Sequence, residues 1–250
     1  MLLTKEIIKA RALSLGFVAC GTAKAGPVDS WHTDYMERWL QAGCNGIMSY
    51  LERNREKRYN PTLLEPGCRT VVSVAFEYGS KADAAATQDS KVARFARFDA
   101  NTDYHRFIKD KLYTLLEDLN TISDVRIAGR AFVDSAPLME RYWATECGVG
   151  YSGKNHLLFV PGIGSYVLLG ELLIDTPLPE YDKPLEPHCH NCGICISKCP
   201  GMALSEDFPY IDACKCVSYR TIELTGRKRI GTEQYGCDVC QEHCPLNSGK

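Results

Sequence analysis

The sequence has no apolar stretch that could cross a membrane. Its longest apolar run, residues 166–174, contains Glu171 and falls well short of the roughly 20 residues that a spanning helix needs. The first 17 residues mix charged and apolar side chains and lack the apolar core of a secretory signal. We therefore expect a soluble, cytoplasmic protein with no membrane partner.

The glycine patterns that hold nucleotide phosphates are also missing. The chain has no GxxxxGK[ST] loop, and no GxGxxG follows a predicted strand. Gly162-Ile163-Gly164 lacks the third glycine and lies in a predicted turn. Neither a P-loop enzyme nor a dinucleotide-binding dehydrogenase of the usual kind is indicated.

Neither sign of charge dominates. The 29 basic and 31 acidic residues give a formal net charge of −2, so no chain-wide basic surface for nucleic acid is predicted, although one basic face is compatible with this balance. With 250 residues, 45 % of them hydrophobic, the chain can form one large domain or two ordinary ones. No internal repeat or low-complexity segment is evident.

Cysteine is scarce in the first three quarters of the chain and abundant in the last. The early cysteines, which we expect to be buried small hydrophobes without ligand spacing, are Cys20, Cys44, Cys68 and Cys147. Four prolines between residues 175 and 187 predict an extended connector. The expected domains are therefore residues 1–175 and residues 176–250.

Two cysteine runs in the second domain have iron–sulfur spacing. Residues 189–200 read CxxCxxCxxxCP, the bacterial pattern in which the fourth cysteine binds the other cluster of a pair. Residues 237–245 read CxxCxxxCP, with Gln234 where a full copy has cysteine. Zinc would need two CxxC pairs at one tetrahedral site, and disulfides would need an oxidising compartment. Two 4Fe–4S clusters, fed by an external reductant, explain the spacing better than either alternative.

Eight thiolates can serve two such clusters if one ligand comes from upstream of residue 237. One cluster would take Cys189, Cys192, Cys195 and Cys244, and the other Cys199, Cys237, Cys240 and either Cys214 or Cys216.

The first 175 residues mix predicted helices and strands, which indicates an α/β or α+β fold. Two apolar runs around a glycine turn further predict a hairpin. Helices are expected after Thr4 and over residues 33–54 (in two pieces), 104–119 and 138–147, strands over residues 17–21, 70–76 and 125–133, and the hairpin over residues 157–160 and 166–174.

Asp134 is the first candidate for acid–base chemistry. It ends a predicted strand and precedes a turn, which places a carboxylate at the edge of a sheet. A partly buried acid with a raised pKa could deliver a proton there. An N-cap for the helix predicted after Pro137 is the structural alternative. The basic residues 53–58 could bind an anion or form a solvated helix end, and Gly153-Lys154-Asn155 could approach a ligand or form a plain turn.

The whole chain resembles the epoxyqueuosine reductases. The combination of matching residues is more specific than the cysteine runs, which many ferredoxin-like proteins share. The matches are Gly16-Phe17, Ala19-Cys20-Gly21, residues 50–58, Pro66-Gly67, Arg97-Phe98, Asp103-Tyr104-His105, residues 132–137, Glu140-Arg141, Gly153-Lys154-Asn155, Gly164-Ser165, residues 170–173, residues 216–219, residues 221–223, Gly236-Cys237-Asp238 and Cys240-Gln241.

The resemblance implies a nitroreductase-like cobalamin-binding domain followed by a bacterial two-cluster ferredoxin-like domain. It implies that the cyclopentane epoxide of epoxyqueuosine in tRNA is reduced to queuosine. Electrons would pass from a flavodoxin- or ferredoxin-type donor through two 4Fe–4S clusters to cobalamin. We expect a monomer.

The resemblance also implies roles for particular residues. Asp134 matches the family's proposed proton donor, and Cys216 rather than Cys214 matches a cluster ligand. The residues expected to contact cofactor or substrate are Lys57, Arg97, Tyr104, Asp134, Arg141, Lys154, Asn155 and Ser218.

Two other functions remain open on the sequence. A corrinoid and iron–sulfur reductase could act on another substrate, such as a halogenated organic compound, although typical dehalogenases carry an export signal. A non-catalytic electron-transfer module is the second alternative. Longer members of the resembled family continue into helical repeats that grip tRNA, whereas this sequence stops six residues after Cys244, so we expect a short form.

Overall fold

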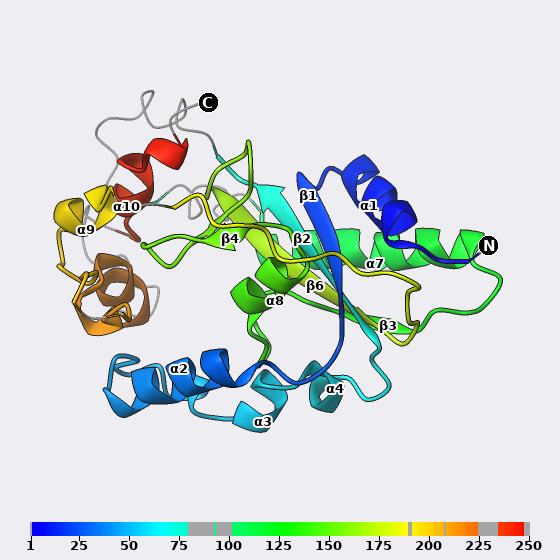
Figure 1. Cartoon of the computed structure of the whole chain (residues 1–250), viewed down its shortest axis with the longest axis horizontal. Helices are drawn as coiled ribbons and strands as arrows, with labels where there is room; N and C mark the ends of the chain where they lie inside the picture. Colours follow the sequence, from blue (N-terminus) through cyan, green and yellow to red (C-terminus); the bar gives the residue numbers. More distant parts are fainter. Residues whose placement is uncertain are drawn as a thin grey trace.

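The core of the protein is a four-stranded sheet in the order β1-β2-β6-β3 (Figure 1). The structure, a computed structural model, describes residues 2–79, 93, 102–189, 192–207, 209–224 and 235–247. Each neighbouring pair of strands in this sheet is antiparallel, which confirms the mixed fold class and places it in the α+β group. The strands are β1 (Ala19–Lys24), β2 (Thr70–Glu77), β3 (Gly129–Phe132) and β6 (Val167–Ile174).

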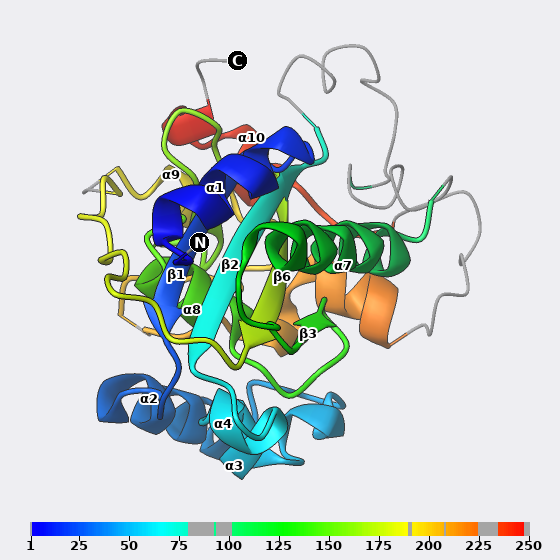
Figure 2. The same cartoon turned by 90° about the vertical axis from the view of Figure 1, so that its right-hand side faces the viewer.

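Helices cover both faces of this sheet. Helices α1 (Lys5–Ser14) and α7 (Tyr104–Ile122) lie on one face, and α8 (Glu140–Glu146) lies on the other (Figures 1 and 2). Because side chains alternate along a strand, Val72 packs toward α1 and α7 whereas Val71 packs toward α8. Two apolar cores result, one on each side of the sheet.

Four predicted helices are confirmed, three of them with shifted ends, whereas the second helical piece expected within residues 33–54 is reduced to a 3₁₀ turn. The Thr4 side chain caps α1 by accepting a hydrogen bond from the Ile7 amide at 3.5 Å. Asp103 caps α7 by accepting from the His105 amide at 3.0 Å. The segment at residues 33–54 is α2 (Ser30–Gln41) followed by a single 3₁₀ turn, η1 (Ser49–Leu51).

The predicted hairpin is wrong. Strand β5 (Leu158–Phe159) pairs with β4 (Tyr151–Ser152), and β6 instead lies between β2 and β3 in the main sheet. A single bridge between Val160 and Gly164 closes the glycine turn. Strand β6 is an apolar run that is buried between two neighbouring strands. The sequence of such a run does not indicate which strands it pairs with.

The remaining elements flank the sheet. The connector at residues 175–187 contains neither helix nor strand, as predicted, and Asp182 fixes it to the edge of the sheet by accepting from the Thr22 amide at 2.9 Å. No helix in the described ranges is long and apolar enough to span a membrane. The other elements are α3 (Arg55–Arg58), α4 (Pro61–Leu64), α9 (Ile194–Lys198), η2 (Ala213–Lys215), η3 (Tyr219–Glu223), α10 (Val239–Glu242) and η4 (Pro245–Asn247).

The early and the late cysteines lie in different parts of the structure. All four early cysteines are buried, which confirms them as core residues. The cysteine-bearing elements α9, η2 and α10 gather with the neighbouring η3 at one end of the molecule, at the left of Figure 1. The two groups of cysteines therefore occupy different environments.

Candidate active site and iron–sulfur ligands

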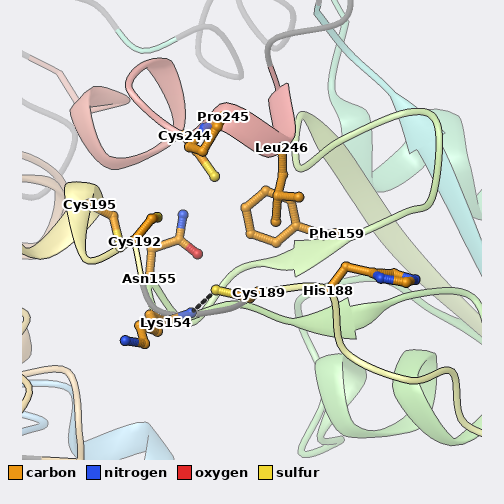
Figure 3. A pocket seen from close by; sticks show the side chains of 10 residues that line it. All are labelled: Lys154, Asn155, Phe159, His188, Cys189, Cys192, Cys195, Cys244, Pro245 and Leu246. Carbon is orange, nitrogen blue, oxygen red and sulfur yellow. Dashed lines mark hydrogen bonds between the residues drawn. The ribbon is translucent and has the colours of Figure 1, made fainter.

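Four of the predicted cluster ligands surround one cavity. Cys189, Cys192, Cys195 and Cys244 line a space of about 150 Å³ (Figure 3). The ring of Phe159 and the side chain of Leu246 form an apolar wall of this cavity. The Lys154 amide donates a hydrogen bond to Cys189 Sγ at 3.3 Å, and such bonds to cluster sulfurs raise or lower a reduction potential.

The other four predicted ligands form a second group. Burial raises the pKa of the Cys237 thiol, and the neighbouring Cys216 and Cys199 thiolates raise it further. Burial likewise raises the pKa of Cys240 to about 12, with added repulsion from Cys237 and Cys216. Because clustered thiols resist ionisation unless a cation compensates them, this grouping suits ligation by metal.

Among the described residues, no three cysteine, histidine, aspartate or glutamate side chains converge on a point where one metal ion could be held. The argument for iron–sulfur clusters over zinc is the CxxCxxCxxxCP spacing of residues 189–200.

Cys214 and Cys216 differ in their neighbours. Cys214 is exposed, and its thiol points to the Gly43 carbonyl at 3.6 Å. Burial raises the pKa of the nearby Cys44 thiol, and Asp212 and Cys214 add to this effect. Cys216 instead lies near Cys237 and Cys240. This arrangement favours Cys216 as the upstream ligand, a role that stays a prediction.

A glycine allows the second group to assemble. A Cβ at Gly201 would lie 1.9 Å from the Lys215 carbonyl oxygen. This close approach brings the chain after Cys199 against the chain before Cys216. Gly201→Ala is therefore expected to separate these two thiols and lower the iron content by about half. Iron analysis checks this, with Gly26→Ala as the matched control because nothing lies within 4 Å of a Cβ there. Unchanged iron in Gly201→Ala would contradict the close contact.

Asp134 lies in a turn directly after β3, beyond the edge of the sheet. Its backbone adopts φ 54°, a left-handed conformation that is uncommon outside glycine. Tyr104 donates a hydrogen bond from its hydroxyl to Asp134 Oδ2 at 2.6 Å. His105 Nε2 lies 3.5 Å from the same oxygen, and His105 Nδ1 lies 2.9 Å from Asp103 Oδ1. A carboxylate, a phenol and an imidazole thus meet at one exposed position.

Two expectations for Asp134 need correction. Its side chain is 62 % exposed, whereas partial burial was predicted. The alternative role as an N-cap is wrong, because α8 begins at Glu140 after Met139, with no side-chain cap. Accessibility leaves Asp134 free to meet an incoming substrate.

The predicted pocket residues do not all lie together. Arg141, the first helical residue after Glu140, donates to the His156 carbonyl oxygen, and His156 Nδ1 lies 3.4 Å from Tyr35. Lys57 is exposed on α3. Arg97 lies outside the described residues.

Three further predicted residues lie beside the cysteines. Lys154 contacts Cys189 through its amide, as above, and its ammonium group lies 3.5 Å from Glu206. The buried Asn155 side chain donates to the Cys240 carbonyl oxygen at 3.3 Å. Ser218 precedes the π-helical turn η3, two residues after Cys216. The Lys154-Asn155 segment therefore joins the sheet domain to both groups of cysteines.

Two acidic residues beside Asp134 had no role assigned from the sequence. Glu140 Oε1 accepts a hydrogen bond from the Asp134 amide at 2.5 Å. Glu171 is fully buried in β6, and burial raises its pKa well above its ordinary value. A lone carboxylate inside an apolar strand was the available signal in the sequence.

Two family models match parts of this chain, and related proteins match nearly all of it. Residues 58–135 match the family model described as "Epoxyqueuosine reductase QueG, DUF1730", and residues 188–247 match a 4Fe–4S double cluster binding domain. The epoxyqueuosine reductases of Cellulophaga algicola and Cyclobacterium marinum are 38 % and 39 % identical, over 97 % of this chain and 78 % of each relative.

Solved structures show the same likeness. Epoxyqueuosine reductase from Bacillus subtilis, with its aspartate-bearing catalytic loop swung out of the active site, superposes with a TM-score of 0.78 at 31 % identity. An epoxyqueuosine reductase with an epoxyqueuosine-modified tRNA-Tyr stem loop superposes with a TM-score of 0.77 at 31 % identity. Each comparison covers 98 % of this chain and 65 % of the solved chain, so this chain spans about two thirds of their length.

The α+β sheet with its double-cluster segment defines an iron–sulfur oxidoreductase. Within that class, the identity over nearly the whole chain decides the family: the protein belongs to the epoxyqueuosine reductases. The resemblance inferred from the sequence is thereby confirmed.

Proposed function

We propose that this protein reduces the epoxide of epoxyqueuosine in tRNA to the alkene of queuosine. One observation carries the proposal: an exposed carboxylate, held by Tyr104 and His105, lies in the same chain as two groups of four cysteines. The family relatives support it, including the protein studied with a modified tRNA stem loop.

The reaction requires two electrons and two protons. The carbon–oxygen bonds of the epoxide break, a carbon–carbon double bond forms, and the oxygen leaves as water. Asp134 would protonate the departing oxygen from its exposed carboxyl group. His105, which faces both Asp134 and Asp103, can return a proton to Asp134, and the Tyr104 hydroxyl keeps that carboxyl oriented.

Cobalamin is the proposed second cofactor, and it would supply a strongly reducing cobalt centre when bound. The structure holds a suitable donor: Arg58 Nε is buried without a hydrogen-bond partner in the described part of the chain, and Arg58 faces Tyr50 and Glu140 near Asp134. Corrinoid amide side chains are acceptors that such a donor could satisfy. Tyr104, Arg141 and Lys57 are proposed to hold the same group, with Lys154, Asn155 and Ser218 between it and the clusters.

The remaining assignments are also proposals. Residues 1–175 would form the cobalamin-binding domain and residues 176–250 the ferredoxin-like domain. A flavodoxin- or ferredoxin-type protein would donate electrons one at a time. We propose that the protein acts as a monomer in the cytoplasm, where tRNA is modified.

An anaerobic assay tests this function. The protein, loaded with iron, sulfide and cobalamin, is incubated with epoxyqueuosine-containing tRNA and a low-potential reductant, and the nucleosides are analysed by mass spectrometry. Queuosine is the expected product. A reductive dehalogenase is similar in fold, with a TM-score of 0.63 at 17 % identity. Halide release from a bromophenol without queuosine formation would favour that second function.

A further inference from the structure

A buried acid lies in the middle of the sheet. Glu171 lies in β6 opposite Ser73 of β2 and Phe132 of β3, and its exposed fraction is 0 %. Ser73 donates a hydrogen bond from its hydroxyl to Glu171 Oε1 at 3.3 Å. Glu171 Oε2 is buried without a hydrogen-bond partner among the described residues. An ionised carboxylate in such a place is costly, so this group needs a proton or a compensating charge.

A second acid, Glu140, lies beside Glu171 and reaches the reactive loop. Burial raises the pKa of Glu140 to about 7, and the Asp134 carboxylate raises it further. Burial and the charge of Glu140 raise the pKa of Glu171 well above its ordinary value. Burial therefore favours the protonated form of Glu171, whereas Glu140 changes its charge near neutral pH.

The other charged groups around the pair are few. Helix α8 contributes Arg141, which stabilises the Glu140 anion, and Cys147, whose pKa burial raises well above its ordinary value. Arg58 faces Glu140 from α3. Strand β2 contributes the neutral Ser73. No cation is hydrogen-bonded to Glu171 among the described residues, so only a proton can neutralise it.

The Asp134 turn depends on this pair for its conformation. Asp134 has φ 54°, and its amide donates to Glu140 Oε1 at 2.5 Å. A hydrogen bond to an ionised acceptor is about twice as strong as one to a neutral acceptor. Anionic Glu140 consequently holds the left-handed backbone and directs the Asp134 side chain toward Tyr104.

We propose that Glu140, with the buried acid Glu171 beside it, acts as a pH-sensitive positioning residue that holds the amide of Asp134. Protonated Glu171 stabilises the Glu140 anion, and the Glu140 anion holds the amide of Asp134. When Glu140 is protonated, below a pH of about 7, its hydrogen bond from the Asp134 amide weakens and the turn loses this support. Its effect on turnover rests on the proposed function, whereas its effect on the turn does not.

Hydrogen exchange measures the turn directly. Exchange of the amides in residues 133–138 is followed by mass spectrometry from pH 6 to pH 8, corrected for the intrinsic pH dependence of exchange. In the wild-type protein, protection is expected to rise about tenfold across this range. Glu140→Gln, which offers only a neutral acceptor, is expected to show low protection that no longer changes with pH.

Glu171 supplies the conservative control. Glu171→Gln keeps an uncharged polar side chain beside Glu140, so wild-type protection is expected, whereas Glu171→Leu removes that polar group and is expected to lose protection. Glu146→Gln, in the same helix, should match the wild-type protein. Wild-type pH dependence in Glu140→Gln, or equal losses in Glu171→Gln and Glu171→Leu, would overturn the proposal.

Turnover provides a second readout. In a functioning enzyme, Glu140→Gln is expected to lower kcat about tenfold and to remove the acid limb of its pH profile, with KM little changed. Loss of iron together with turnover would point to a purely structural role and overturn the proposal. If the wild-type protein forms no queuosine, the proposed function fails, but hydrogen exchange still decides whether the pair positions Asp134.

Discussion

Asp134→Ala is expected to lower queuosine formation by about 10²- to 10⁴-fold, the range associated with losing one acid–base group. The variant loses the only group proposed to protonate the departing oxygen. Asp134 contacts Tyr104, His105 and Glu140 rather than cysteines, so iron content should not change. Single-turnover kinetics and iron analysis on the same preparation measure both quantities.

Asp134→Asn tests whether the carboxyl group itself, and not only the shape of the side chain, is needed. Asparagine tolerates a positive φ and preserves size, but it cannot supply the proton, so it should be as inactive as alanine. Asp110→Ala, which changes an exposed residue paired with Arg106, is the control and should remain active. A fully active Asp134→Asn would remove Asp134 from the proton-donor role.

Cys216→Ala is expected to lose about half of the iron and all turnover, because one cluster lacks its fourth thiolate and the electron path is interrupted. Cys214→Ala should keep the iron, since that thiol is exposed and lies against Gly43 instead. Iron and sulfide analysis with electron paramagnetic resonance of the reduced protein distinguishes the two variants. The reverse pattern would exchange the roles of Cys214 and Cys216.

The sequence predicted those parts of the fold that depend on local patterns. The apolar face of α7, where Ile108, Leu112, Leu115 and Leu119 are buried, repeats every three or four residues, and this period predicts a helix. Thr4, a residue type that favours the N-cap position, likewise predicts the start of α1. The pairing of β6 with β2 and β3 involves residues far apart in the chain, and an apolar run of this kind does not specify its partners.

The candidate site was predictable in its residue types but not in its geometry. Cysteine spacing indicates clusters because each run restricts which thiols can reach one another. The exposure of Asp134 depends on a turn with positive φ, for which the non-glycine sequence gives no clear signal. The contact between Glu140 and the Asp134 amide depends on where α8 begins, and that boundary was predicted two residues too early.

We propose that electrons from two clusters act on the epoxide at a corrinoid held beside Asp134. The most direct test is a single anaerobic turnover with protein samples that contain both clusters and graded amounts of cobalt. Queuosine formed per protein is predicted to rise in proportion to bound cobalt and to approach one. Equal queuosine formation by cobalt-free protein with both clusters intact would contradict a corrinoid-dependent reduction.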